Sequence, residues 1–338
     1  MVQSSPALSR GDLRDPHSWA PAAAVTASHL EVLRFVTEAA QRGERVALVT
    51  ITSVTGSSSR PLGTLMGVAA DGSFAGSFSG GCIEAAVVAE AQEAMLEGRP
   101  RQVRYGAGSP YIDIKLPCGG GVDLLFQPNP NLEAIRYAVA LLDRREPLIL
   151  IQRASGGLIA RTGLSCQRPE WQGEAFVSWH APPLQIILLG HGAESLALVQ
   201  LSSAYGAKVT LRSPDKRVVA LAKQMGAQAY HMTTPHLPHA FVTDAWSAVV
   251  FLFHDHGWEP ILLERALAQP TFFIGAMGSR QTHANRLEKL RELGVREEAL
   301  ARIAAPLGLI QSARDPVTLA LSALAQVVDG YRKVTTSG

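Results

Sequence analysis

From Gln185 onward, short apolar segments alternate with helical segments, and this alternation constrains the fold more than any other feature of the chain. Strands are predicted at 186–189, 208–211, 248–253 and 271–274, and helices at 193–204, 215–225, 259–268, 279–293 and 315–331. Strands that alternate with helices of roughly 10 to 15 residues are typical of a parallel sheet covered by helices. We therefore predict a doubly wound α/β domain over residues 184–333.

The first half of the chain has a less regular pattern, which predicts a separate mixed α/β domain over residues 26–165. A hairpin is expected around Asp71-Gly72, a dipeptide that favours a two-residue turn between strands. Further helices are expected near 28–42, 83–97 and 131–145, and further strands at 46–52, 122–126, 147–153 and 157–163. Residues 1–25 are rich in Ser, Pro, Ala and Arg, and we expect a flexible extension. Residues 166–183 carry Pro, Gly and polar residues, and we expect a linker or crossover.

Composition excludes several classes of function. Lys and Arg number 31 and Asp and Glu 29, a net charge of +2, whereas a dedicated nucleic-acid binder needs an excess of positive charge. The chain has 3 cysteines, which is too few for a disulfide scaffold and indicates free thiols in a reducing compartment. We find no apolar run long enough to span a bilayer and no signal peptide, so we expect a cytoplasmic protein without membrane contact.

Two cysteines stand beside glycine pairs and are the strongest candidates for chemistry. Cys82 follows Ser79-Gly80-Gly81 at the predicted start of a helix, where unpaired N–H groups and the helix dipole favour a thiolate or an anion. Cys118 precedes Gly119-Gly120, and glycines permit close approach of a ligand to the backbone. Either cysteine alone is compatible with a structural role in a tight turn. The matching neighbours favour a shared site for a thiophilic centre or sulfur chemistry over a zinc site, which lacks further ligands.

The segment from Gly190 to Ser195 has the form of a dinucleotide-binding turn, because Gly190 and Gly192 lie between a predicted strand and a helix. This turn identifies the second domain as Rossmann-like. Ser195 replaces the third glycine, and Arg212 and Ser213 stand where an acid would bind a ribose hydroxyl. The pattern therefore argues against a NAD site, whereas an arginine can bind a phosphate. A Rossmann turn without any ligand is the alternative.

Three further segments carry polar groups in suggestive places. Gly278-Ser279-Arg280 connects a strand to a helix, where Ser279 can cap the helix and Arg280 can add positive charge to an anion site. Arg60 belongs to a polar loop, 56–61, between two strands, which is either an anion-binding loop or solvent-exposed. The segment 254–256, His-Asp-His, ends a strand; a metal or proton-transfer role is possible there, although a structural role is favoured.

Together these motifs resemble the XdhC/CoxI family, the xanthine dehydrogenase accessory proteins. The resemblance extends over about residues 30 to 330. Its N-terminal motifs are the segments 56–61, 79–84 and 116–120, and its C-terminal motifs are 190–195, 254–256, 274–280 and 304–309. The family usually has Gly-Ala-Gly-His at the dinucleotide-type turn, whereas this chain has Gly-His-Gly-Ala at 190–193. The family's acid after the next strand is also replaced here, around Arg212-Ser213.

The resemblance implies a chaperone of the molybdenum cofactor. Family members bind the molybdopterin cofactor, protect it, support its sulfuration by a cysteine desulfurase, and deliver it to an apo molybdenum hydroxylase of the xanthine dehydrogenase or aldehyde oxidase type. It also implies a homodimer and a protein that carries its cofactor without catalytic turnover. Carried over to this chain, the family's cysteines fall on Cys82 and Cys118. The cofactor-binding residues that we predict are Arg60, Ser79, Gly80, Gly81, Cys82, Cys118, Gly119, Gly120, Gly190, Gly192, Ser195, Gly278, Ser279 and Arg280.

Two questions stay open at this point. The cofactor can be molybdopterin itself or a dinucleotide form, whose nucleotide is one candidate ligand for the second domain. The alternative functions are an NAD(P)-dependent oxidoreductase, in which Arg212 selects the phosphorylated nucleotide, and a scaffold that docks a partner without any ligand.

Overall fold

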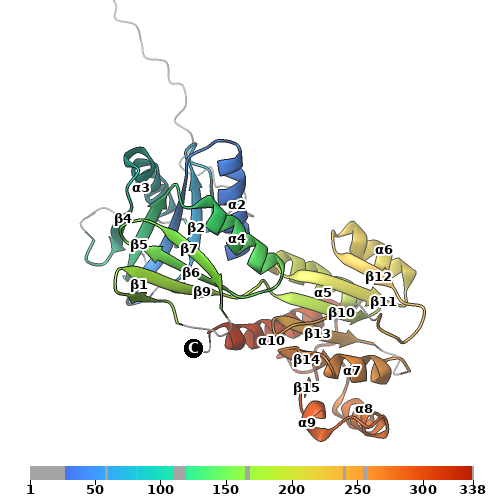
Figure 1. Ribbon diagram of the computed structural model, residues 1–338. Coiled ribbons are helices and arrows are strands. Elements are labelled where there is room, and N and C mark those ends of the chain that lie inside the picture. Colours follow the sequence, from blue (N-terminus) through green and yellow to red (C-terminus); the bar gives the residue numbers. More distant parts are fainter. Residues whose placement is uncertain are drawn as a thin grey trace, which may run out of the picture. The chain divides into compact units, whose positions relative to one another are not determined.

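The computed structural model describes residues 27–57, 60–81, 83–109, 119–163, 168–238, 241–253 and 257–336. The chain forms two compact units (Figure 1). The N-terminal unit ends at Leu132 and also includes Ala154–Gly156, and the C-terminal unit consists of Glu133–Arg153 and the chain from Gly157 onward. This confirms a mixed α/β protein. None of the described helices is long and apolar enough to cross a membrane.

The N-terminal unit is built on a five-stranded sheet with the strand order β3-β2-β1-β5-β4. The strands are β1 (Val46–Thr55), β2 (Leu65–Ala69), β3 (Phe74–Ala75), β4 (Arg101–Gly106) and β5 (Gly121–Pro128), and the helices are α2 (His29–Gln41) and α3 (Glu84–Glu97). The central strand β1 pairs antiparallel with β2 and with β5. Met66 and Val68 of β2 pack with α3, whereas Gly67 between them faces Val36 of α2. The two helices therefore cover opposite faces of this sheet.

Local signals in the sequence account for these elements. Ser28 and Glu31 form the predicted capping box at the start of α2, with each side chain bonded to the backbone N–H of the other residue. Gly98 ends α3 in the left-handed conformation, with φ of 66°. Gly72 has φ of 86° in the turn between β2 and β3, and Asp71 accepts a hydrogen bond from the N–H of Ser73 at 2.8 Å. The predicted hairpin is therefore present.

The C-terminal unit begins with α4 (Leu132–Asp143), whose first residue belongs to the other unit, and continues with a small antiparallel sheet in the order β7-β6-β9-β8. Its strands are β6 (Leu148–Arg153), β7 (Leu158–Thr162), β8 (Glu170–Gln172) and β9 (Ala175–His180). Where a linker or crossover was expected, at 166–183, the structure therefore has two strands. Gly173, with φ of 62°, makes the turn between them, and Phe176, Val177 and Trp179 are buried. This packing outweighs the polar, turn-like local sequence.

The boundary between the two units also lies earlier in the chain than the predicted one at 165. Arg145, which follows α4, forms an ion pair with Asp244, and one of its amino groups donates to the carbonyl of Pro183 at 2.7 Å. Tyr331 of the last helix donates from its hydroxyl to the carbonyl of Pro182 at 2.6 Å. These contacts connect the small sheet to the Rossmann-like part of the same unit.

The second sheet of the C-terminal unit has six parallel strands in the order β12-β11-β10-β13-β14-β15. The strands are β10 (Gln185–Gly190), β11 (Lys208–Ser213), β12 (Gln228–His231), β13 (Ser247–Leu252), β14 (Phe273–Ala276) and β15 (Ile303–Ala304). The helices are α5 (Ala193–Tyr205), α6 (Lys216–Gln224), α7 (Glu259–Leu267), α8 (Arg280–Glu292), α9 (Glu297–Leu300) and α10 (Pro316–Thr336). Numbered within this domain, the order is 3-2-1-4-5-6, the arrangement of dinucleotide-binding folds. The predicted Rossmann-like domain is thus confirmed.

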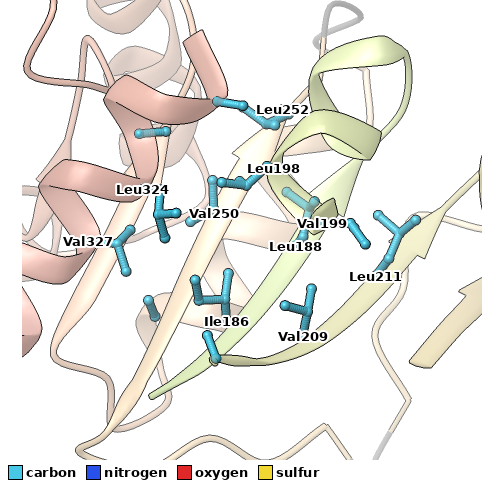
Figure 2. Close-up of a cluster of buried hydrophobic side chains, with 14 of the residues drawn as sticks. Ile186, Leu188, Leu198, Val199, Val209, Leu211, Val250, Leu252, Leu324 and Val327 are labelled. Atoms are coloured by element: carbon cyan, nitrogen blue, oxygen red, sulfur yellow. The ribbon is translucent and has the colours of Figure 1, made fainter. Parts of the chain in front are cut away.

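Hydrophobic clusters on both faces of this sheet hold the domain together. On one face, Leu198 and Val199 of α5 and Leu324 and Val327 of α10 pack over apolar strand residues such as Val250 (Figure 2). On the other face, α7 and α8 pack on β10, β13 and β14 through Leu262, Leu263 and Leu290, together with Phe251 and Ile274 of the strands. Burial on both faces explains why these strands are nearly continuous apolar runs in the sequence.

Candidate functional site

Three loops meet at one edge of the N-terminal sheet, and they contain the predicted site residues of this unit. Thr55 at the end of β1 and Gly106 at the end of β4 both pair with Gly121, the first residue of β5. The loop that follows β1 therefore starts at this edge. The connection between β4 and β5 both starts and ends there. The loop that follows β3 leads to α3 and reaches the same place, because its Ser77 carbonyl accepts a hydrogen bond from Arg60 Nε at 3.1 Å.

Gly120 brings two of these loops into direct contact. A Cβ atom at Gly120 would lie 2.2 Å from the carbonyl oxygen of Ser57 and 2.9 Å from that of Thr55. Both are backbone atoms, so a side chain at this position requires the loops to move apart. The glycine is therefore explained by close packing of two backbone segments. The segment that follows Cys118 lies directly against the segment that follows β1.

Arg104 fixes the same edge from the side of β4, and sequence reasoning did not identify it. Its guanidinium pairs with Asp123 of β5 at 3.0 Å, donates to the carbonyl of Ala107 at 2.7 Å, and donates to the hydroxyl of Thr55 at 2.9 Å. One side chain thus connects three strand ends. The signal in the sequence was weak, because β4 itself was not predicted.

Glu84, the first residue of α3, organises the loop that contains Cys82. Its carboxylate accepts seven hydrogen bonds from this loop. The donors are the hydroxyls of Ser77 and Ser79 and the backbone N–H groups of Phe78, Ser79, Gly80, Gly81 and Ile83. The distances from Gly81 N and Ile83 N to Oε2 are 2.7 and 3.2 Å. Both peptide neighbours of Cys82 are therefore fixed by the same carboxylate oxygen.

These hydrogen bonds determine the charge state of Glu84. Burial alone would raise the pKa of this carboxyl, but the hydrogen bonds from Ser79 and Ser77 prevail and lower the pKa to about 2. The carboxylate is thus ionised at neutral pH although only 6% of the residue is exposed. A fixed negative charge therefore sits at the N-terminus of α3.

This carboxylate corrects part of the interpretation of the loop. The sequence analysis expects unpaired N–H groups beside Cys82 that favour a thiolate or cradle an external anion. In the structure, the N–H groups of Ser79, Gly80, Gly81 and Ile83 donate to Glu84 instead. The internal carboxylate occupies the position that an anionic ligand would otherwise take. Ser79, Gly80 and Gly81 therefore shape the loop and do not offer these donors to a ligand.

Two glycines at this edge are exposed and have left-handed backbone conformations. Gly80 and Gly119 have φ of 76° and 67°, and no heavy atom of the described chain lies within 4 Å of the position that a Cβ atom would take. A flat heterocycle can approach the backbone closely at such positions. Cys82, Cys118 and Cys166 lie outside the described residues, as do residues 254–256.

The predicted site residues of the Rossmann-like domain lie at the carboxyl edge of its parallel sheet. A Cβ atom at Gly190 would lie 2.5 Å from the carbonyl oxygen of Leu252, so this glycine lets β10 and β13 approach. Gly192, with φ of 85°, is the N-cap of α5 and offers no side chain to the helix N–H groups. Ser195 is fully buried and donates its hydroxyl to the carbonyl of His191 at 3.1 Å. A small side chain is thus accommodated in place of the third glycine.

The turn after β14 lies at the same edge. A buried ion pair holds this turn through a hydrogen bond to its backbone. Ser279 caps α8 by accepting a hydrogen bond from Thr282 N at 3.1 Å, as predicted, and Arg280 is exposed. Arg286 pairs with Glu259 at 3.0 Å and donates to the carbonyl of Met277 at 2.6 Å. Both charged residues are nearly inaccessible to solvent, with 3% and 1% exposure. Sequence reasoning missed this pair, because its members are 27 residues apart on two helices.

The structure thus assembles the predicted residues into two groups, one in each unit. The N-terminal group contains Arg60, Ser79, Gly80, Gly81, Gly119 and Gly120, and the C-terminal group contains Gly190, Gly192, Ser195, Gly278, Ser279 and Arg280. Among the described residues, no three His, Cys, Asp or Glu side chains are grouped so that they could hold a metal ion.

Comparison with known proteins identifies the family. Residues 39–106 match the family model described as the XdhC and CoxI family, and residues 186–327 match the model of the XdhC Rossmann domain. The second match covers the six-stranded sheet from β10 to the last helix. Over 316 residues the chain is 35% identical to the molybdenum cofactor insertion chaperone PaoD of Escherichia coli K12. The matched region covers 93% of this chain and 92% of PaoD.

The chain belongs to the XdhC and CoxI family. A second relative is the uncharacterized protein YqeB of Escherichia coli K12, with 24% identity over 88% of this chain and 46% of YqeB. Among solved structures, a Bacillus halodurans protein described as a xanthine dehydrogenase has a TM-score of 0.72 and 21% identity, with 89% of this chain and 96% of that chain covered. This likeness supports the fold of the XdhC and CoxI family member described here.

Proposed function

We propose that this XdhC and CoxI family protein is a chaperone that binds the molybdenum cofactor and hands it to an apo molybdoenzyme. The similarity to PaoD, an insertion chaperone for this cofactor, supports the proposal over nearly the full length of the chain. The structural observation that carries it is the meeting of loops at one edge of the N-terminal sheet. Gly81 precedes Cys82 in one loop, and Gly119 follows Cys118 in a second segment, which contacts the loop after β1 through Gly120.

The chemistry of this edge suits a pterin-type cargo with a thiophilic metal. Thiolates are soft ligands, and we assign to Cys82 and Cys118 the protection of a molybdenum centre from water and oxidants. Open space at Gly80 and Gly119 permits a heterocycle to lie against the backbone. Arg60 brings positive charge to this edge, and we assign the cofactor's phosphate to it.

The further steps follow from the same proposal. The cofactor receives its terminal sulfido ligand from a cysteine desulfurase while bound, and the recipient is an apo molybdenum hydroxylase of the xanthine dehydrogenase or aldehyde oxidase type. The protein acts as a homodimer and binds, orients and transfers its cargo without catalytic turnover. Gly278, Ser279 and Arg280 lie in the C-terminal unit, and their part in cofactor binding stays a prediction.

Anaerobic purification from a host that makes the cofactor tests the proposal. We expect molybdenum, measured by mass spectrometry, and an oxidised pterin, measured by fluorescence, to accompany the wild-type protein. Cys82→Ala and Cys118→Ala should each lower both signals. Cys166→Ala is the matched control and should load like wild type. Equal loading of all three variants would refute the assignment of the two cysteines.

A transfer assay tests the later steps. Loaded protein is mixed with an apo molybdenum hydroxylase, and hydroxylase activity is followed with and without a cysteine desulfurase and cysteine. We expect activity to appear only when loaded chaperone is present, and to rise when the desulfurase has acted first. Activity that arises equally well from free cofactor would argue against delivery by this chain.

A further inference from the structure

We propose that the Rossmann-like domain binds a dinucleotide whose ribose carries a phosphate ester, and that Arg212 binds this phosphate. The site lies at the carboxyl edge of the six-stranded sheet, where β10 and β11 end. It belongs entirely to the C-terminal unit and does not depend on the proposed cofactor transfer by the N-terminal unit.

The register of the sheet puts Arg212 beside the glycine turn. Arg212 of β11 is paired with Leu189 of β10, and the turn begins one residue later, at Gly190. In a parallel sheet both strand ends face the same crevice, where dinucleotides bind across the first two strands. Gly192 caps α5 without a side chain, so the first turn of this helix presents backbone N–H groups on the same edge. A pyrophosphate at this turn leaves its ribose near the end of β11.

The guanidinium of Arg212 is stacked on a ring and is not paired with a carboxylate of the described chain. Its guanidinium lies over the ring of Tyr230, on the neighbouring strand β12, at 4.8 Å from the ring centroid. Its Nε is buried and has no hydrogen-bond partner, and no carboxylate of the described chain pairs with it. A guanidinium stacked on a ring keeps its N–H edge free for bidentate bonds to a phosphate. Tyr230 is 48% exposed and Arg212 is partly buried, so solvent reaches part of the stacked pair.

The nearby acid has a structural role as a helix cap. In NAD-binding domains, a carboxylate at this strand end accepts hydrogen bonds from the ribose hydroxyls. Here Asp215 accepts from the N–H of Arg217 at 2.7 Å and is the N-cap of α6. The hydroxyl of Ser213 accepts from the N–H of Asp215 at 3.1 Å, which holds the acid in this role. Arg212 therefore stands at the end of β11 while Asp215 caps α6, which favours a phosphorylated ribose over one with two free hydroxyls.

A titration with matched nucleotides tests this site. NADPH and NADH differ by the ribose phosphate, and CDP represents the nucleotide part of a cytosine dinucleotide. With the full-length protein, free of molybdenum, we expect NADPH to bind about 10- to 100-fold more tightly than NADH, measured by calorimetry. Arg212→Gln should weaken NADPH to the affinity of NADH and leave NADH unchanged. Arg217→Gln, which removes an exposed arginine from α6 nearby, is the control and should change neither.

Several results would overturn the proposal. Equal affinities for NADPH and NADH, tighter binding of CDP than of NADPH, or no detectable binding of any of the three would each refute a site for a phosphorylated ribose. Arg212→Lys keeps the charge but loses the bidentate geometry, and we expect intermediate affinity for NADPH. Its melting temperature, measured together with that of Arg212→Gln, shows whether either variant is folded. The readout is independent of molybdenum loading, so a failure here leaves the chaperone proposal intact.

Discussion

Ser79 contacts both oxygens of the Glu84 carboxylate: its N–H lies 2.8 Å from Oε1, and its hydroxyl lies 2.7 Å from Oε2. The chain between these residues, which includes Cys82, therefore closes on itself through one buried negative charge. The N–H groups at a helix start often donate to water or to a ligand, whereas in this loop they donate to Glu84. The loop geometry is thus built into the protein before any ligand binds, which reduces the entropic cost of binding.

We predict that Glu84→Gln loosens this loop without unfolding the sheet. A neutral amide is a poorer acceptor than a carboxylate, and one of its two ends donates, so several of the seven hydrogen bonds are lost. We expect a loss of about 1.5–3 kcal/mol in the free energy of unfolding, typical of hydrogen bonds to a charged group. Hydrogen exchange should be faster at Gly81 and Ile83, and cofactor loading should fall. Glu93→Gln on the exposed side of α3 is the matched control.

Acid should weaken the N-terminal unit through the same carboxyl. The pKa of Glu84 is about 2 in the folded protein, against 4.5 for an ordinary glutamate, because Ser79 and Ser77 donate hydrogen bonds that outweigh the effect of burial. A lowered folded pKa contributes stability that is complete above pH 4.5 and is lost as the pH falls toward 2. The contribution is about 3 kcal/mol. Urea unfolding of wild type and Glu84→Gln over this range should show a smaller pH dependence in the variant; parallel curves would contradict the assignment.

Much of the fold is predictable because local chemistry and tertiary packing agree. The capping box of Ser28, the Gly98 helix end and the turn at Gly72 are local signals, and the structure contains all three. The alternation from Gln185 predicts the parallel sheet, since its strands are buried on both faces. The strands at 170–172 and 175–180 escape prediction because β9 pairs with β6, far away in the chain, and β8 is then added to the edge of β9.

The sequence predicts which loops form the candidate site, but it does not predict the hydrogen bonds and ion pairs that hold these loops. Glycine pairs beside cysteines identify the loops, and the turn at Gly190 identifies the nucleotide-type edge. The partner of the loop N–H groups was misjudged, because a helix N-terminus is equally well satisfied by an external anion or by Glu84. Arg104 and the Arg286–Glu259 pair depend on contacts between distant elements, which periodicity does not reveal.

Two neighbouring glycines should respond differently to alanine. Gly120→Ala introduces a Cβ atom 2.2 Å from a backbone oxygen of Ser57, so the loops must separate, and we expect a loss of about 1–3 kcal/mol in unfolding free energy. Gly119→Ala meets no atom of the described residues within 4 Å but forces a left-handed backbone, with φ of 67°, and costs about 1–2 kcal/mol. If Gly119 faces the cofactor, its variant loses more loading than its stability explains. Urea unfolding and pterin content, measured on both variants, separate these effects.

The buried ion pair between Arg286 and Glu259 should stabilise the fold only when both charges are present. Arg286→Met leaves the carboxylate of Glu259 buried and without its guanidinium, and removing one partner of a buried pair costs about 3–5 kcal/mol. The double variant with Glu259→Leu removes both charges, and we expect it to be more stable than Arg286→Met alone. Arg280→Met, six residues earlier on the exposed start of the same helix, is the control and should unfold like wild type. Urea unfolding of these four proteins and of Glu259→Leu alone measures the coupling; a double variant no more stable than Arg286→Met would show that Glu259 contributes through other contacts than this arginine.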